Sequence, residues 1–408
     1  MLSIDMLKLP FFSNQKSDPT KFLTVNFNTD NVKCLALYRE NGGVKIIGSG
    51  KGLIDPGSVR SGNIIAKENV TNALVTAVAE ATAELGENIN SVIFGISGDL
   101  CLGQMTTIKA KRNGEFPISK KEMNNLYARI NDAAYIQAQN EYLQITGNSE
   151  VNLEIVTSSN VYIKLDNQRV PSLENRHGAV IETAVFNAFV PEFHINTLQN
   201  LAKKCQLQIM AIGSEMYALV QTILSSHHDL NDFIAIEVDS DYTNVAVIFG
   251  RGIVATKNLN IGYKHFVEGV SERMGLTMRE AERVLKSYIT GKLTEKEGNI
   301  VNSALKTTLE IWLTGLELLF SEYTGVKTFA SKIFITGEGA DVPELWEIIK
   351  TDAWARGVPF KEAPDFEKLT FLDLGKVTDG TGKVASSEWL TTASLSLIYL
   401  ELEGLLND

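Results

Sequence analysis

Three short loops of this 408-residue chain hold the side chains best placed to do chemistry. They span Asn26–Val32, Glu237–Asn244 and Gly337–Asp341, and the residues before each form an apolar run typical of a buried strand. Small polar residues in such turns can direct backbone N–H groups at a phosphate. The glycines of the third loop would let the backbone approach a flat ligand, although a tight turn into a helix also explains them.

Acidic side chains crowd the first two loops. Asp30, Glu237, Asp239 and Asp241 lie there, and Lys33 is the only cation nearby in the sequence. Two like unit charges about 4 Å apart repel by about 4 kcal/mol at an effective dielectric of about 20. A triphosphate would therefore need Mg²⁺ to bridge it to these acids. Alternatively, no nucleotide binds and the acids decorate a relic pocket.

An internal duplication positions the first two loops. The segments Phe22–Gly48 and Phe233–Leu259 lie about 211 residues apart, and each consists of apolar runs separated by short turns. Such runs predict antiparallel strands, and apolar residues at helical spacing follow each copy. The sequence therefore predicts an α/β fold of two related lobes, with the loops meeting between them.

A segment with its own pattern separates the two copies. It opens with a helix-capping pattern at Ser119–Glu122 and continues with two runs of alternating apolar residues, which predicts a small inserted α+β subdomain. The predicted organisation is an N-terminal extension (1–20), a first lobe (21–113), the insertion (114–192) and a second lobe (193–408).

Composition excludes several classes of protein. The net charge of -11 argues against a protein that mainly grips nucleic acid. No apolar run reaches the ~18 residues of a membrane-spanning helix, although Leu2–Phe12 could form a short interfacial helix or dock on the domain. Three separated cysteines indicate a reducing compartment. The histidines show no metal-ligand spacing, so no metal site is predicted, and we expect His227 and His228 on a solvated loop.

From Phe22 to Leu402 the chain resembles the FtsA family of actin-like cell-division proteins and its PilM relatives. The resemblance rests on the segments Ser61–Asn63, Ile96–Gly98 and Ala281–Tyr288, on the GEGADVPEL stretch from Gly337, and on the inserted segment. It implies a duplicated actin-like (ribonuclease H-like) fold, with ATP and Mg²⁺ as cofactors.

The same resemblance implies the residues of a nucleotide site. Phosphate contacts would come from Asn28, Thr29, Asp239, Ser240 and Thr243, adenosine contacts from Gly337, Gly339 and Ala340, ribose or purine contacts from Glu282 and Lys286, and a catalytic carboxylate from Glu237. The two phosphate loops depart from the family patterns, approximately DIGTSK and DIGGGTTD, because they lack the glycines. Side chains in those places narrow the cradle, so we do not expect efficient hydrolysis. Glu282 and Lys286 also fit a simple i,i+4 surface pair.

The resemblance implies a scaffold of bacterial cell division. It would bind the tail of the tubulin-like ring protein and self-associate through the insertion, in the cytoplasm or peripherally at the inner face of the membrane. A PilM-like pilus-assembly scaffold that binds a short peptide of an inner-membrane protein is the alternative, and a small-molecule kinase of the same fold is a third. The final apolar stripe (Leu395, Ile398, Leu402 and Leu405) is expected to be core rather than membrane anchor.

Overall fold

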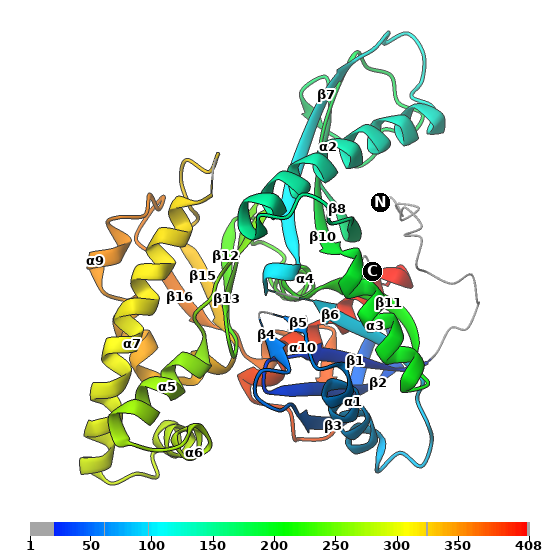
Figure 1. Ribbon diagram of the computed structural model, residues 1–408. Coiled ribbons are helices and arrows are strands. Elements are labelled where there is room, and N and C mark those ends of the chain that lie inside the picture. The colour runs from blue at the N-terminus through cyan, green and yellow to red at the C-terminus, as the bar shows by residue number, and fades with distance from the viewer. Residues whose placement is uncertain (1–19, 61, 97, 324, 406–408) are drawn as a thin grey trace.

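The computed structural model describes residues 20–60, 62–96, 98–323 and 325–405 (Figure 1). The apolar segment Leu2–Phe12 lies outside the described residues, as do Ser61 and Ser97 of the two short motifs. No helix among the described residues is both long and apolar enough to span a bilayer.

The first sheet is built on an antiparallel meander. Strands β1, β2 and β3 pair in sequence order, β6 lies parallel to β1, and β11 lies parallel to β6. A short strand, β17, adds in parallel to the free edge of β3. The bounds are β1 Lys21–Phe27, β2 Asn31–Glu40, β3 Gly43–Leu53, β6 Ser91–Ile96, β11 Gln208–Ser214 and β17 Val377–Asp379.

The second sheet repeats this topology. Strands β12, β13 and β14 form the same antiparallel meander, with β15 parallel to β12 and β16 parallel to β15. The predicted duplication is therefore confirmed, because both copies share strand order and direction. The bounds are β12 Phe233–Val238, β13 Thr243–Phe249, β14 Gly252–Leu259, β15 Lys332–Thr336 and β16 Asp365–Lys368.

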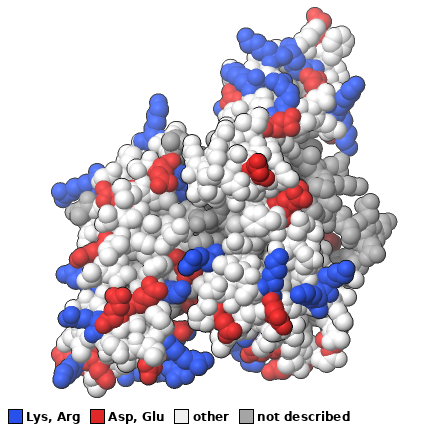
Figure 2. All heavy atoms as spheres, in the orientation of Figure 1, with Lys and Arg blue, Asp and Glu red and all other residues white. Residues whose placement is uncertain are grey.

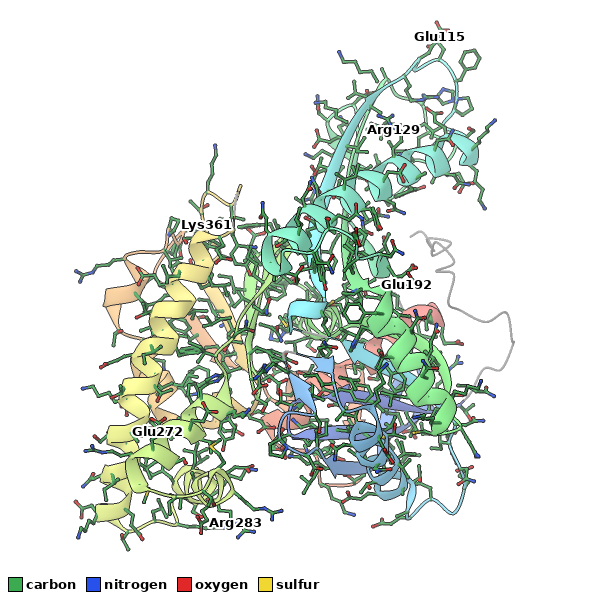
Figure 3. All side chains as sticks on the ribbon, viewed as in Figure 1. Glu115, Arg129, Glu192, Glu272, Arg283 and Lys361 are labelled. Carbon is green, nitrogen blue, oxygen red and sulfur yellow. The ribbon has the colours of Figure 1, made fainter. Side chains whose placement is uncertain are left out.

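The inserted strands extend the second sheet. They continue from β14 in the order β7-β10-β8-β9, with α2 packed against them. Glu115 marks their outer end, far from the lobes (Figure 3), where lysine and arginine gather (Figure 2). The bounds are β7 Leu102–Lys111, α2 Lys120–Thr146, β8 Leu153–Leu165, β9 Gln168–Arg169 and β10 Val180–Pro191.

Helices cover both sheets. Those that pack with the first sheet are α1 Lys67–Thr82, α3 Glu192–Lys204, α4 Glu215–Ser226, α10 Leu390–Ser394 and α11 Ser396–Leu402. Those of the second lobe are α5 Tyr263–Met274, α6 Met278–Ile289, α7 Glu295–Ser321, α8 Pro343–Ile349 and α9 Asp352–Ala355. The remaining short elements are β4 Val59–Arg60, β5 Asn63–Ile64, η1 Gly98–Leu100, η2 Glu338–Asp341, η3 Phe371–Asp373 and η4 Ser387–Trp389.

The lobes divide the chain differently from the predicted boundaries. Strand β7 falls in the predicted first lobe but pairs with β10 of the insertion along its length. Strand β11 and helix α4 fall in the predicted second lobe but belong to the first, because β11 pairs with β6. The C-terminal helices also return there (Figure 1), where Tyr399 stacks on Phe22 with ring centroids 4.2 Å apart. As predicted, the final apolar stripe packs against this core.

A glycine stripe lets α1 approach β3 closely. A Cβ added to Gly48, Gly50 or Gly52 would lie 1.8–2.0 Å from a backbone carbonyl oxygen of α1. Glycine at alternate positions faces one side of a strand, so the sequence GSGKG builds a flat surface for the helix. This packing fixes the position of β3 and, through it, of the first loop between β1 and β2.

The chain crosses between the lobes at residues 227–232 and 369–376. His227 forms the C-cap of α4, and its ring centroid lies 5.1 Å from that of Phe334. The expectation of a solvated loop was therefore wrong for His227, because the end of α4 packs against the second sheet.

Candidate functional site

The first two predicted loops meet at equivalent positions of the duplication. Asn28 Nδ2 donates to Asp239 Oδ1 over 3.2 Å, and these residues are 211 positions apart, as the repeats are. Both turns close with the same backbone bond, from Asn28 N to Asn31 O at 2.8 Å and from Asp239 N to Tyr242 O at 3.0 Å. Thr29 Oγ1 also donates to Asp241. Side chains of the loops therefore bridge the lobes directly.

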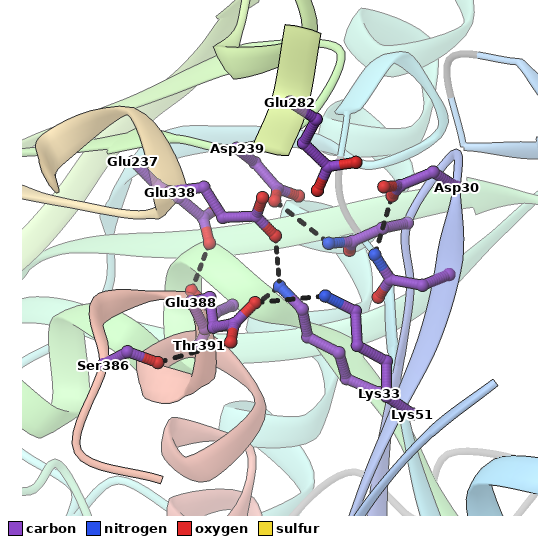
Figure 4. A network of polar contacts seen from close by, with 12 residues as sticks. Asp30, Lys33, Lys51, Glu237, Asp239, Glu282, Glu338, Ser386, Glu388 and Thr391 are labelled. Atoms are coloured by element: carbon purple, nitrogen blue, oxygen red, sulfur yellow. Dashed lines mark hydrogen bonds and ion pairs between the residues drawn. The ribbon is translucent and has the colours of Figure 1, made fainter. Parts of the chain in front are cut away.

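Lys33 anchors the centre of this cleft network (Figure 4). It projects from β2, is 2% exposed, and donates from Nζ to Glu338 Oε1 and to the carbonyl oxygen of Glu388, each at 2.9 Å. Burial lowers the pKa of Lys33, but Glu338 and Asp239 outweigh it and hold the pKa above its ordinary value. Burial raises the pKa of Glu338, yet Lys33 and Lys51 outweigh it and lower the pKa to about 2. Both groups are therefore charged at neutral pH and neutralise each other.

Further ion pairs close the rim of the cleft. Lys51 Nζ lies 3.1 Å from Glu388 Oε2. Asp341 Oδ1 lies 2.6 Å from Lys368 Nζ and accepts from Ser387 Oγ at 2.8 Å. The segment that returns to the first lobe therefore bonds to both sides of the cleft.

Glu237, the predicted catalytic carboxylate, is 2% exposed and already bonded. One oxygen accepts from Thr391 Oγ1, and the other accepts from Asn244 Nδ2 at 2.9 Å. Burial raises its pKa. Burial, followed by the charge of Glu237, raises the pKa of Asp239 to about 8. At neutral pH Asp239 is therefore mainly protonated.

The other predicted phosphate contacts, Thr243 and Ser240, are buried in the second lobe. Thr243 Oγ1 donates to the carbonyl oxygen of Ile261 at 2.7 Å and accepts from Trp312 Nε1 at 2.9 Å, so its hydroxyl is engaged inside the second lobe. Ser240 is 4% exposed, and its carbonyl oxygen accepts from the backbone N–H of Lys264 at 2.8 Å.

The glycines of the third loop fit closely against β12. Gly337 has φ of +90°, and a Cβ there would lie 2.4 Å from the carbonyl oxygen of Val238. A Cβ on Gly339 would lie 2.3 Å from the Val238 side chain, and Ala340 is fully buried. Packing within the lobe is thus sufficient reason for these small residues.

Glu282 and Lys286 form the i,i+4 pair on α6, with Nζ and Oε1 2.5 Å apart. Glu282 nevertheless reaches toward the cleft network (Figure 4). The structure therefore joins Asn28, Thr29 and Asp239 across the lobes, whereas the hydroxyl of Thr243 and the small residues of the third loop are engaged within the second lobe. Sequence analysis missed Lys51, Glu388 and Thr391. The one signal that could have pointed to the network is Lys33, a lysine within the buried strand β2.

Solved structures share this architecture at low sequence identity. The PilM-PilN type IV pilus biogenesis complex matches with a TM-score of 0.64, 14% identity, 94% of this chain and 99% of that chain covered. The ethanolamine utilization protein EutJ from Carboxydothermus hydrogenoformans matches with a TM-score of 0.50, 10% identity, 94% and 91% covered. The chain has the actin-like fold. No protein-family profile and no curated protein matches the sequence.

The asparagine side chains of the cleft are not oriented to bind a phosphate. The amide nitrogens of Asn28 and Asn31 donate to Asp239 and Asp30, which fixes the orientation of both amides. Their Oδ1 atoms and Asp239 Oδ2 are buried without a hydrogen-bond partner among the described residues. Asparagine carbonyl oxygens accept bonds, as phosphate oxygens do, and so offer a phosphate no donor. Water could donate to them, and they are also oxygen ligands of the kind that Mg²⁺ binds.

Charge leads to the same result. Lys33 is a buried cation on β2, next to the first loop, and Glu338 neutralises it. Lys264, next to the second loop, lies 3.3 Å from Asp241. A triphosphate would have to separate these pairs and enter beside buried carboxyl groups, which is unfavourable in a low-dielectric site.

A separate cavity of about 210 Å³ lies where the inserted subdomain meets both lobes. Its walls include Gln144 and Ile145 of α2 and Lys257 of β14. Lys257 Nζ lies 3.1 Å from Glu141 Oε1 and 3.9 Å from Glu322 Oε2. Ile145 is 51% exposed, and polar and apolar side chains share the lining of the cavity.

Proposed function

We propose that the chain is an actin-fold scaffold that binds a segment of a protein partner, and that its own side chains replace a nucleotide between the lobes. The contact between Asn28 and Asp239, at equivalent positions of the two copies, carries this proposal. A nucleotide in such a cleft would have to lie between these two loops. Here the loops bond to each other instead.

Efficient ATP hydrolysis has little support from this arrangement. A phosphoryl-transfer site needs a free group to orient the attacking nucleophile and cations to stabilise the developing charge. Both oxygens of Glu237 accept bonds from protein donors, and Lys33 is paired with Glu338. A small-molecule kinase is disfavoured for the same reasons.

A pilus-assembly role is the form of the proposal that the comparisons favour. The PilM-PilN complex is an assembly of two proteins, and the match extends over 94% of this chain. By analogy, this chain would bind a short peptide of an inner-membrane pilus protein. The sequence resemblance to FtsA supports a division scaffold that binds the tail of the tubulin-like ring protein as the second candidate.

The cavity beside α2 is the proposed contact point for the partner. Its lining mixes polar and apolar side chains and includes the exposed Ile145, a composition suited to an amphipathic peptide. Because three parts of the fold form its walls, a bound segment could sense the position of the insertion relative to the lobes.

Titration with labelled peptides tests this proposal. We expect saturable, nucleotide-independent binding of the pilus peptide, the ring-protein tail or both. Gln144→Trp should weaken it at least tenfold by filling the cavity, whereas Asn124→Trp, exposed earlier on the same helix, should not. Absence of binding by both peptides, or binding only with ATP present, would contradict the proposal.

A further inference from the structure

The two segments that cross between the lobes are joined to each other. Ser226 Oγ, at the end of α4, donates to the carbonyl oxygen of Asp373 in η3. It also accepts from the backbone N–H of Gly375 at 3.0 Å. Anything else that binds both segments would act on the connection between the lobes.

Three side chains with metal-binding groups converge at this junction. His227 belongs to one crossing, Asp373 to the other, and Glu367 lies on β16 just before the second crossing. One ligand atom from each lies within 4.8 Å of the other two, and all three residues are half-buried. They come from separate elements, so tertiary folding alone brings them together.

Neighbouring groups orient the three side chains. His227 Nδ1 lies 3.1 Å from the carbonyl oxygen of Ile223. Because a carbonyl oxygen only accepts, the neutral imidazole bonds here with its proton on Nδ1, which leaves the lone pair on Nε2. Asp373 Oδ2 accepts from the backbone N–H of Thr370 at 2.7 Å and from its hydroxyl at 2.8 Å, which leaves Oδ1 for another partner. Metal-binding histidines and carboxylates are usually held by such outer bonds.

The local charge favours a cation but includes one competitor. Lys332 Nζ lies 2.6 Å from Glu367 Oε2 and 2.7 Å from Asp365 Oδ2. With Asp373 included, the carboxylates near this lysine outnumber it. Arg251, another cation near the junction, donates to carbonyl oxygens at the end of α4, among them that of Leu224 at 3.0 Å.

We propose that His227, Glu367 and Asp373 bind a divalent transition-metal ion that clips the two crossings together. An imidazole nitrogen with two carboxylate oxygens suits zinc, whose bonds to such atoms are about 2.0–2.2 Å. Ligands of one zinc ion lie roughly 3–4 Å apart, so the present separations, all within 4.8 Å, need at most small side-chain rotations. Imidazole disfavours magnesium and calcium, which prefer oxygen. Water completes the coordination, and the role is structural.

Calorimetric titration of the chelator-treated full chain with Zn²⁺ tests the proposal. We expect one site, and a cobalt-loaded sample should show the visible absorption of a bound Co²⁺ ion. His227→Gln and the pair Glu367→Gln with Asp373→Asn should each lower the affinity at least tenfold. His228→Gln, at the adjacent residue, should leave it unchanged, and Lys332→Ala should raise it by freeing Glu367.

Two results would overturn the proposal. One is no zinc binding by the folded wild-type chain. The other is an affinity that persists in the His227 and carboxylate variants, because the ion would then bind elsewhere, for example at the free thiols. Circular dichroism of each variant shows whether it is folded, so a loss of binding can be assigned to the lost ligand.

Discussion

Replacing Asp239 with asparagine should remove a pH dependence from the stability of the fold. The pKa of Asp239 is raised from 3.8 to about 8, first by burial and then by the charge of Glu237. Between these two values the folded chain holds a proton that the unfolded chain has released. The contribution to stability is therefore complete below pH 3.8 and is lost as the pH rises through about 8.

The size of the effect follows from the linkage between proton binding and folding. Each pH unit inside this window lowers the free energy of unfolding by about 1.4 kcal/mol. From pH 6 to pH 8 the loss is about 2 kcal/mol, because the slope flattens near the upper pKa. Asparagine has nearly the same shape as the protonated acid and can still accept from Asn28, so Asp239→Asn should lack this loss. Glu237 and Asp239 titrate as a pair, and the variant removes the proton-binding step of this pair that occurs at the higher pH.

Urea denaturation at pH 6 and pH 8, followed by tryptophan fluorescence, measures the effect. We expect the stability of Asp239→Asn relative to the wild type to increase by about 2 kcal/mol between these pH values. Asp132→Asn, at an exposed position of α2, should give no such change. An equal difference at both pH values would refute the assignment of a buried, protonated acid to the cleft.

Three other tests by substitution probe the packing and pairing around the cleft. Lys33→Met or Glu338→Leu alone should lower the free energy of unfolding by about 3–5 kcal/mol, because each leaves a buried charge without its partner. The double variant should be close to the wild type in stability, and additive losses in a double-mutant cycle would contradict this. Gly50→Val should lower the free energy of unfolding by at least about 3 kcal/mol, because the new side chain forces α1 away. Ser49→Val, on the other side of β3, should lower it by about 1 kcal/mol or less, and urea denaturation that ranks the two variants the other way would exclude the close helix contact. Thr243→Val should cost about 2–4 kcal/mol because both bonding partners of its hydroxyl lose their bond, and an unchanged melting curve would show that the hydroxyl has no structural role.

The repeated meander could be predicted from the sequence because short turns and alternating apolar residues are local signals. The copies at Phe22 and Phe233 fold alike, down to the backbone bond that closes each loop. The lobe boundaries could not be predicted in the same way. Whether β7 joins β10 and whether β11 joins β6 is decided by contacts between residues far apart in the sequence.

The candidate site was predictable as a place but not as a network. The loops carry the acids that the sequence suggested, yet Lys33 and one oxygen of Glu237 bond to residues more than 150 positions away. The direction of a hydroxyl is also invisible in the sequence, so Thr243 fits a phosphate contact until its bonds to other parts of the lobe are known.

Calorimetric titration with Mg²⁺ and ATP tests most directly whether the protein's own side chains close the cleft. The account predicts no saturable heat at about 1 mM nucleotide, which corresponds to a binding free energy weaker than about -4 kcal/mol. Binding with a micromolar dissociation constant would contradict it, because the Asn28–Asp239 and Lys33–Glu338 contacts would then have to open for the ligand.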